Sequence, residues 1–472
     1  MRFGSDTEKK RLNGALIVGI GASMLGIAGT RLIARSVVNK VIDRFYNIIS
    51  KDLYDENLWE LISSTIRMTP QVAMETNLRA TEPKMLERPM GTPKKLPNLD
   101  SLQFNVAQLH TMPTDTLTEI DTQVTIGKRA SKPFTIKMPI MIAPMAYGVA
   151  LSKKVKIALA RGAKMAGTAT NSGEGAFLPE ERGEAGIFIY QYNRGHYGKT
   201  PEILRSCDAV EIQFGQGGYG GAGHIVNDKL IDRQMRLDFG VPRGTDIVAH
   251  SRQPEVQSPE DLPALVEKLR DITEGVPIGA KIGAGKYMEK DLAYLCESGV
   301  DFITVDGAEA ATKGSPPIFQ DDFGVPTVFA IHRAAQWIKN NGYRDQVSLI
   351  VSGKIRTPGE VLKARALGAD ACYMGSIALF AISHSQLDKP LPYEPPTTLV
   401  WYNAHYSRHF DIDKGAESLN NFLEACNLEI ADGIRGLGKT SLAQVSKDDL
   451  VSIDETVAKG CAIPMVYEPY VF

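Results

Sequence analysis

Short apolar runs recur along the middle of the chain, and most are followed by a segment with helical spacing. Because the runs are continuous rather than alternating, they predict strands covered by helices, as in a parallel sheet. Eight is the number of strands that closes a (β/α)8 barrel, so we predict an α/β protein with a TIM barrel. The runs are Ile140–Met145, Thr168–Asn171, Ile187–Tyr192, Ala209–Phe214, Ile278–Ile282, Phe302–Val305, Val347–Val351 and Ala371–Met374.

A doubly wound open sheet is the alternative to the barrel. Such a sheet carries a nucleotide-type glycine fingerprint after its first strand, and Pro144-Met-Ala-Tyr-Gly148 does not have that form. A β-hairpin is predicted ahead of the barrel from Asp121–Ile126 and Phe134–Lys137. The clearest helices are predicted at Lys153–Met165, Pro259–Thr273, Glu289–Ser298, Val328–Lys339 and Pro358–Leu367.

The stretch Ile350–Ser376 predicts a phosphate site. Its first strand ends at Gly353, Thr357–Glu360 has the composition of a helix start, and the next strand ends at Gly375 and Ser376. In a TIM barrel the loops after the seventh and eighth strands, with a helix N-terminus nearby, commonly bind phosphate. An ordinary βαβ unit with glycine caps and no ligand fits these residues equally well.

Polar side chains gather at the carboxyl ends of the predicted strands, where barrel enzymes keep their active sites. Amides suit the donor and acceptor edge of a flavin pyrimidine, and a strand lysine can hold negative charge on the reduced ring. One glutamine at a strand end would be an ordinary loop residue, but several beside a phosphate site favour a flavin. These residues are Asn171, Ser172, Glu174, Gln191, Gln213, Gln216, Lys281, Asp306 and Gly353.

Composition excludes some classes of function. The 472 residues carry a net charge of -2 with a pI near 6.5, which gives no electrostatic reason to expect nucleic-acid binding. The five cysteines are widely spaced, and no pair has the spacing of a zinc, iron–sulfur or redox site. We therefore predict no metal site and expect buried free thiols in a reducing compartment.

Residues 12–30 contain no charged side chain and are about long enough for a helix to cross a bilayer. We predict a single-pass membrane anchor there, with the catalytic domain on the cytoplasmic side. A signal peptide and a glycine-rich helix packed inside an oligomer are the alternatives. Basic residues flank both ends of the segment, so the positive-inside rule does not decide its orientation.

The anchor is followed by residues 37–68, whose amphipathic helical pattern suits either a membrane surface or a solvated stalk. Prolines between residues 83 and 97 then mark a domain boundary. The predicted parts are a tail (1–11), the transmembrane helix (12–30), a juxtamembrane segment with a proline-rich linker (31–98), the barrel with its leading hairpin (99–388) and a helical C-terminal extension (389–472).

Short motifs follow one another in a fixed order between about Phe104 and Ile453. Asn171-Ser-Gly-Glu-Gly175 is the most distinctive. The others are Pro139–Met145 with Tyr147-Gly148, Glu211-Ile212, Gly215-Gln-Gly217, Ser258–Leu262, Gly353-x-x-Arg356-Thr357, Leu367–Asp370, Gly415–Glu417, Asn421-Phe422 and Asp448–Leu450. Their order and spacing resemble the FMN-binding domain of the glutamate synthase family.

The resemblance implies an FMN-dependent oxidoreductase that passes a hydride to an imine formed from 2-oxoglutarate and ammonia, or that acts on a related amino or imino acid. Glu174 would position the substrate or relay a proton, and Lys281 would stabilise the reduced flavin. Cofactor contacts are then expected from Ala143, Met145, Asn171, Ser172, Gln191, Gln213, Gln216, Lys281, Asp306, Gly353, Lys354, Gly375 and Ser376.

Several positions depart from the family's pattern. The lysine that grips the oxo-acid carboxylates after the fourth strand has no counterpart, and Tyr219 stands near that place. His224 and Arg236 are candidate substitutes in substrate binding, although a solvated loop arginine explains Arg236 equally well. The remaining departures are Ala146 for a serine, Lys354 for the second phosphate-loop glycine, and Ala310-Ala311 for a glycine pair.

The family also places three cysteines soon after the eighth strand, and residues 377–401 contain none. Because cluster ligation needs thiolates, we predict no iron–sulfur cluster. Electrons would then come from a membrane quinone, a partner flavoprotein or NAD(P)H, and ammonia from a separate glutaminase. A non-catalytic or electron-relay flavin subunit of a larger membrane complex is the alternative function, and a barrel that binds a sugar phosphate is a third.

Overall fold

The structure, a computed structural model, describes residues 30, 32–54, 57–88, 90–310, 313–386 and 397–469. Its contacts divide the chain into two compact units, Met1–Leu86 and Glu87–Phe472. This division falls before residue 98, where the sequence predicted the end of the juxtamembrane segment.

The described part of the first unit is helical, with a helix over residues 32–51 followed by α2 (Leu58–Met68) and α3 (Pro70–Thr81). The break between the first two helices was not predicted from the amphipathic pattern over residues 37–68. Asn57 accounts for it, because its Oδ1 accepts from the Trp59 N–H at 2.9 Å and its Nδ2 donates to Ile48 O at 2.9 Å. One side chain thus caps the start of α2 and binds a carbonyl of the preceding helix.

In the part of the chain that the structure describes, no helix is both long enough and apolar enough to cross a membrane. The predicted membrane anchor, residues 12–30, lies outside the described residues except for Thr30. The anchor therefore stays a prediction.

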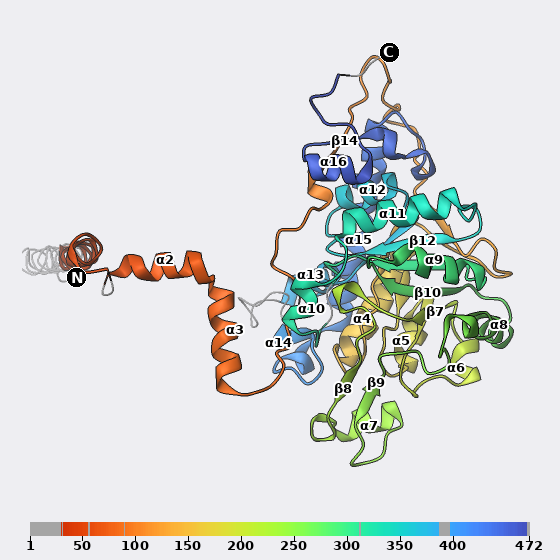
Figure 1. The fold of residues 1–472 in the computed structure, drawn as a ribbon, viewed down its shortest axis with the longest axis horizontal. Coiled ribbons are helices and arrows are strands. Elements are labelled where there is room, and N and C mark those ends of the chain that lie inside the picture. The colour runs from red at the N-terminus through yellow and green to blue at the C-terminus, as the bar shows by residue number, and fades with distance from the viewer. Residues whose placement is uncertain are drawn as a thin grey trace, which may run out of the picture. The chain divides into compact units, whose positions relative to one another are not determined.

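The second unit is built on a closed barrel of eight parallel strands, as the apolar runs predicted (Figure 1). The alternative prediction, an open doubly wound sheet, is therefore wrong. Around the barrel the strand order is β10-β11-β12-β13-β4-β5-β6-β7. In chain order the strands are β4 (Ile140–Ile142), β5 (Ala169–Asn171), β6 (Ile187–Tyr192), β7 (Ala209–Gln213), β10 (Ile278–Gly283), β11 (Phe302–Asp306), β12 (Ser348–Ser352) and β13 (Ala371–Met374).

Helices follow the strands and cover the outside of the barrel. Four of the five predicted helices lie within one residue of their expected bounds, and the fifth, predicted from Pro259, begins at Leu262 after a short 3-10 turn. The covering helices are α4 (Lys153–Met165), α5 (Pro179–Glu184), α6 (Pro201–Arg205), α8 (Leu262–Ile272), α9 (Met288–Glu297), α11 (Thr327–Asn340), α12 (Pro358–Ala366) and α13 (Ser376–Ser383). Short α10 (Pro317–Asp322) and α14 (Thr397–Val400) lie in the connections.

The predicted hairpin is confirmed as β2 (Val124–Ile126) paired antiparallel with β3 (Phe134–Ile136). Its buried Ile126 and Ile136 belong to the same apolar cluster as Ala209 and Phe302, the first residues of β7 and β11. The hairpin therefore packs against the amino-terminal end of the barrel. The carboxyl-terminal end, which we call the barrel mouth, is the end at which the polar side chains lie.

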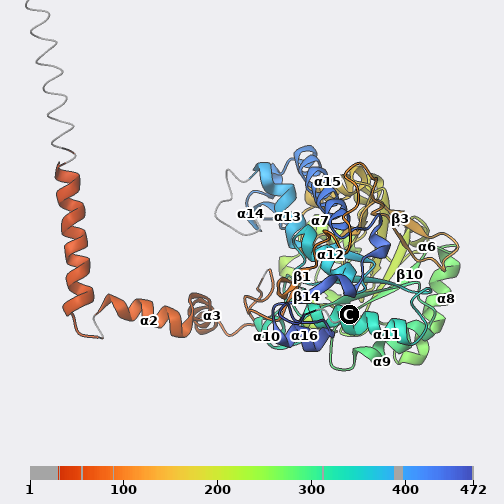
Figure 2. The same cartoon turned by 90° about the horizontal axis from the view of Figure 1, so that it is seen from above.

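The two ends of the second unit meet, because β1 (Leu102–Phe104) pairs antiparallel with β14 (Leu450–Ser452), as Figure 2 shows. The long helix α15 (Ile412–Gly436) packs on α4, and a side chain at Gly162 would lie 2.9 Å from Ala416 O. Only glycine allows this close approach. The described chain ends with α16 (Glu455–Cys461) and a short loop.

An insertion between β7 and α8 was not predicted. It contains β8 (His224–Val226), α7 (Arg233–Phe239) and β9 (Ile247–Ala249), and it projects from the lower side of the barrel in Figure 1. Phe239 contacts the Tyr197 ring at 4.8 Å between centroids, and Tyr147 OH donates to Asp238 at 2.6 Å. The insertion thus packs on the loops that follow β4 and β6.

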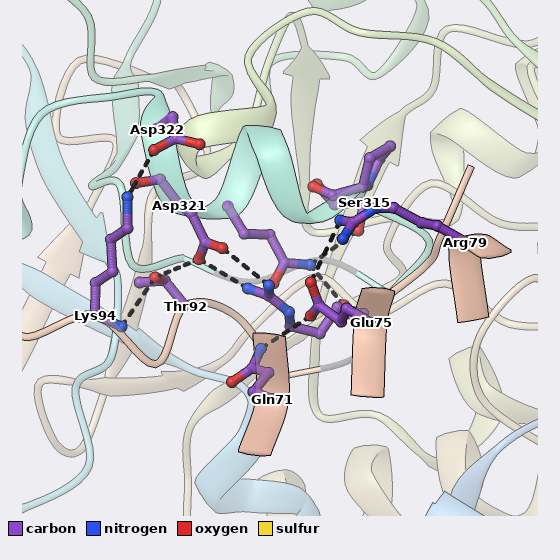
Figure 3. A network of polar contacts seen from close by, with 11 residues as sticks. Gln71, Glu75, Arg79, Thr92, Lys94, Ser315, Asp321 and Asp322 are labelled. Carbon is purple, nitrogen blue, oxygen red and sulfur yellow. Dashed lines mark hydrogen bonds and ion pairs between the residues drawn. The ribbon is translucent and has the colours of Figure 1, made fainter. Parts of the chain in front are cut away.

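The first residues of the second unit are tied to α10. Arg88 makes a bidentate ion pair with Asp321, at 2.7 and 2.9 Å, and Thr92 Oγ1 donates to the same carboxylate at 2.7 Å. Lys94 Nζ pairs with Asp322 at 2.6 Å, and Figure 3 shows Thr92 and Lys94 pointing toward these two acids. Against the effect of burial, the hydrogen bonds from Arg88 and Thr92 hold the pKa of Asp321 below its ordinary value.

We expect Arg88→Met to destabilise the second unit by about 2 kcal/mol, because a mostly buried Asp321 would lose a charged bidentate partner. Urea unfolding measures the loss, and hydrogen exchange of the peptide covering residues 88–97 should rise. Lys94→Met is the matched control, because the Lys94–Asp322 pair is about half exposed and should contribute at most about 1 kcal/mol. Equal effects of the two substitutions would contradict this account.

Candidate functional site

One buried carboxylate lies at the centre of the polar side chains inside the barrel. Glu211 of β7 is 0% exposed and accepts hydrogen bonds from side chains of four other strands. Burial raises the pKa of Glu211, and the Lys281 ammonium opposes that rise. The donors are Asn171 Nδ2 at 3.0 Å, Gln191 Nε2 at 2.9 Å, Thr304 Oγ1 at 2.6 Å and Tyr373 OH at 3.3 Å.

The network leaves one amide donor available. Gln191 Nε2 also donates to Gln213 Oε1 at 3.2 Å, so the amide nitrogen of Gln213 is turned away from that bond. Gln213 is 0% exposed, and its Nε2 has no hydrogen-bond partner among the described residues. A buried donor without a partner is costly, and a bound ligand would satisfy it.

Lys281 of β10 and Asp306 of β11 form a buried ion pair at 3.0 Å. Burial raises the pKa of Asp306, while Lys281 and a hydrogen bond from the Gly217 backbone oppose the rise. Asp306 Oδ1 has no hydrogen-bond partner among the described residues. The structure thus places a second unsatisfied polar atom beside the predicted flavin lysine.

The turn Asn171–Gly175 packs tightly on the loop after β4. Gly173 has a φ of +70°, and a Cβ there would lie 2.5 Å from the backbone of Met145 and Ala146. Asn171 Oδ1 accepts from the Gly173 N–H at 3.0 Å, and Ser172 Oγ accepts from the Gln191 N–H at 2.9 Å. Glycine is therefore required, and the predicted site residues of this turn are held by local hydrogen bonds.

A buried lysine, Lys156, holds this turn through hydrogen bonds to its carbonyl groups. Lys156 Nζ donates to the carbonyls of Asn171 and Ser172, at 3.0 and 3.1 Å, and pairs with Glu181 at 2.9 Å. Both side chains of the pair are 1% exposed. Burial raises the pKa of Glu181 to about 7, and the ammonium of Lys156 opposes this rise.

Glu174, predicted to act on the substrate, is bound by Arg194. Its Oε1 accepts from the Arg194 N–H at 2.7 Å and from Nε at 3.0 Å, and its Oε2 accepts from a terminal guanidinium nitrogen at 2.9 Å. The Arg194 side chain is 1% exposed and also donates to Ala222 O at 3.1 Å. A substrate contact through Glu174 would therefore compete with this arginine.

The glycine-rich loop after β7 lies against the ends of β10 and β11. A Cβ at Gly217 would lie 2.0 Å from Ala310 O, and one at Gly218 would lie 2.2 Å from Phe319 O. Tyr219 packs on the Phe319 ring at 5.4 Å between centroids, and its hydroxyl donates to Gly223 O. At Gln216, just before these residues, the backbone exchanges hydrogen bonds with Gly220.

The two residues predicted to bind the substrate after the fourth strand, His224 and Arg236, lie in different surroundings. His224, on β8, is partly buried, and burial lowers its pKa while Glu87 and Glu174 oppose the shift. Arg236, on α7, pairs with Asp228 and donates to Pro242 O at 2.9 Å. The hydrogen bonds of Arg236 are thus made inside the insertion, whereas the charge of Glu174 affects the pKa of His224.

Two of the predicted phosphate residues, Gly353 and Lys354, line a small pocket with about 260 Å³ of empty space, part of it open to solvent. Gly353 has a φ of +135°, and Lys354 adopts a φ of +53°, which is unusual for a residue with a side chain. Glu309 closes one side, because its carboxylate accepts from Thr327 N and Oγ1. The pocket is lined by Asn98, Leu99, Glu309, Thr327, Gly353, Lys354, Arg356 and Glu360.

The second half of the predicted cradle lies at the end of β13. Helix α13 begins at Ser376 after Gly375, and no side chain caps its first N–H groups. A helix start of this kind can bind an anion. Ala143 donates its backbone N–H to Met374 O at 3.0 Å, and Met145 packs partly buried against the core. These residues therefore lie at the barrel mouth, and their contact with a cofactor stays a prediction.

Sequence reasoning did not assign a site role to Glu211, Arg194 or Lys156. The signal for Glu211 was a charge inside an apolar run, because such a residue must face hydrogen-bond donors in the barrel. Arg194 follows the strand-end residues Gln191–Asn193, which gives a weaker signal. Lys156 lies on a helix whose other lysines are surface residues, so the sequence did not distinguish it.

The family model described as "Conserved region in glutamate synthase" matches residues 69–440 of this chain. The glutamate synthase large subunit-like protein of Rhizobium meliloti is 33% identical over 398 residues, covering 80% of this chain and 89% of that protein. The archaeal-type glutamate synthase (NADPH) of Dehalococcoides mccartyi is 30% identical over 392 residues, covering 79% of this chain and 78% of that protein.

Among solved structures, a mutant flavocytochrome b2 with pyruvate bound is similar at 17% identity, covering 79% of this chain and 83% of that one, with a TM-score of 0.48. A structural similarity of this degree does not indicate that the two proteins share a ligand or a reaction. The sequence match covers most of the chain and includes every strand of the barrel. The chain belongs to the glutamate synthase family.

Proposed function

We propose that the protein is an FMN-dependent oxidoreductase of the glutamate synthase type, acting on an amino or imino acid or a related small substrate. The observation that carries the proposal is the set of unsatisfied polar atoms at the barrel mouth of a glutamate synthase family member. Gln213 Nε2 is a buried donor and Asp306 Oδ1 a buried acceptor, both without partners among the described residues. Such a pair suits the donor and acceptor edge of a flavin ring.

The anion-binding half of the site supports the same proposal. Lys354, Gly353 and the uncapped start of α13 at Ser376 would hold the FMN phosphate. Glu309 also lines this pocket, but its carboxylate accepts two hydrogen bonds from Thr327 at the start of α11. The negative charge of Glu309 is therefore partly satisfied by that helix end.

Bound FMN would supply the hydride chemistry. Lys281 would place positive charge where the reduced ring becomes negative, with Asp306 holding its ammonium in place. Glu211 fixes the amides of Asn171 and Gln191, and Gln191 in turn fixes that of Gln213. These side chains thus have a set orientation before any ligand binds.

We also propose the surroundings that the sequence led us to expect. Residues 12–30 would anchor the protein in a membrane as a single span, with the catalytic unit in the cytoplasm. No iron–sulfur cluster is expected, since residues 377–401 contain no cysteine. A quinone, a partner flavoprotein or NAD(P)H would supply electrons, and several relatives carry NADPH in their names. A separate glutaminase would supply ammonia.

A second candidate function is an electron-relay or non-catalytic flavin subunit of a membrane complex. Two observations favour it. Tyr219 stands near the place of the family's substrate lysine, and its ring and hydroxyl are already packed and bonded. Glu174 has both carboxylate oxygens bound by Arg194. Turnover assays on the reduced protein separate this function from the first.

We expect purified full-length protein to show a flavin spectrum and to release FMN, identified by mass, on denaturation. NADPH or a quinol should reduce that flavin, and turnover with an oxo acid and ammonia should reoxidise it. Colourless protein that takes up no added FMN would overturn the proposed function. Reduction without turnover on any oxo acid would support the electron-relay alternative.

We expect Lys354→Gly and Lys354→Ala to weaken FMN binding about tenfold, because a charged hydrogen bond to phosphate is lost. Only the glycine variant should gain stability, by about 1 kcal/mol, since Lys354 has a left-handed φ of +53°. Quenching of FMN fluorescence measures binding, and urea unfolding of the flavin-free protein measures stability. Wild-type FMN affinity in both variants would show that Lys354 does not hold the phosphate.

The charges at the barrel mouth disfavour a substrate with two carboxylates. Lys281 is paired with Asp306 and Arg194 with Glu174, so neither cation has charge to spare for a second carboxylate. We therefore expect monocarboxylic oxo acids to be turned over with a higher kcat/KM than 2-oxoglutarate, by about tenfold. Steady-state rates with matched oxo acids measure this, and a preference for 2-oxoglutarate would contradict it.

A further inference from the structure

The helix of residues 32–51 has one continuous apolar face. Val37, Val41, Phe45 and Ile48 recur at three- and four-residue spacing, which places them on the same side of a helix. Val37 is 55% exposed, Val41 62% and Phe45 50%. Val38 and Ile42, also exposed, widen this face. At 100° per residue these positions form an apolar stripe of the width that an amphipathic surface helix usually has.

The charges of this helix are arranged around that face. Lys40, Arg44 and Lys51 lie together along one border of the apolar stripe, and Arg35 lies along the other. Asp43 lies in the middle of the opposite, polar face. Both borders are therefore basic, and the acidic residue points away from the apolar side.

We propose that this helix lies flat on the surface of an anionic bilayer, with its apolar face among the acyl chains near the headgroups. Basic residues at both borders would reach anionic headgroups, and Asp43 would face water. Near an anionic surface each such lysine or arginine raises the affinity about fivefold. The phosphate and carboxylate groups of lipids such as phosphatidylserine are the chemistry that these borders fit.

A second copy of the chain fits the same face less well. Helices that pair through an apolar stripe usually place charges of both signs along its borders, so that partners attract each other. Here cations border the stripe on both sides, and two copies would bring like charges together. A solvated stalk would leave Val41 and Phe45 in water with no compensating contact.

This surface contact extends the proposed membrane attachment, but it does not depend on FMN or on catalysis. It also concerns residues outside the predicted span. The experiment must therefore distinguish a helix of residues 32–51 that lies on the membrane surface from one that is only held near the membrane by residues 12–30.

Full-length protein carrying Val41→Cys or Asn39→Cys is labelled with an environment-sensitive fluorophore and added to vesicles of phosphatidylcholine with phosphatidylserine. The five native cysteines are buried, and labelled wild-type protein controls for them. Val41 lies on the apolar face and Asn39 on the polar face of the same helix, so they form a matched pair. Vesicle co-sedimentation is recorded alongside quenching by aqueous iodide.

We expect the label at residue 41 to be shielded from iodide severalfold with anionic vesicles, and the label at residue 39 to stay accessible. The added changes Lys40→Glu and Arg44→Glu should abolish that shielding, even if the protein still sediments with vesicles. Equal shielding on phosphatidylcholine alone, or an accessible label at residue 41 on anionic vesicles, would overturn the proposal. Shielding without vesicles would show that a second copy covers the face instead.

Discussion

The barrel mouth depends on the hydrogen bonding of Glu211. A carboxylate with 0% exposure costs several kcal/mol unless donors surround it, and four other strands supply those donors. This requirement fixes the amides of Asn171 and Gln191, because their nitrogens must point at the carboxylate. The donor and acceptor pattern of the site is thus set by folding, which is what preorganised binding of a polar ring requires.

A second constraint comes from glycines that allow backbones to touch. Gly217 and Gly218 bring the loop after β7 against Ala310 and Phe319, and the same loop donates to Asp306. Phe319 lies on α10, which Asp321 ties to the leading segment at Arg88. Parts of the chain that are more than 200 residues apart therefore support one side of the site. This explains why the second unit begins at Glu87 rather than at its first barrel strand.

The sequence predicted the barrel, its strands and its clearest helices because buried parallel strands leave continuous apolar runs, and these need no knowledge of tertiary contacts. It did not predict the insertion of residues 224–249, whose short strands and seven-residue helix α7 carry little periodicity. The break before Asn57 was also missed, because it depends on a capping hydrogen bond rather than on the apolar pattern. Glu211 left a signal, a charge inside an apolar run, but the partners of Glu211 and of Arg194 became recognisable only when the strands placed them side by side.

The charged groups of the site occur as pairs, and this limits which of them can be substituted without a cost in stability. Lys281 with Asp306, Arg194 with Glu174, and Lys156 with Glu181 each join two side chains of which at least one is almost fully buried. Losing one member would leave the other charge without compensation, at a cost of several kcal/mol. Tyr219 and Lys354 lie at loop positions outside these pairs. The paired charges at the barrel mouth are therefore constrained by folding, whereas a substitution at Tyr219 or Lys354 would leave no buried partner charge without compensation.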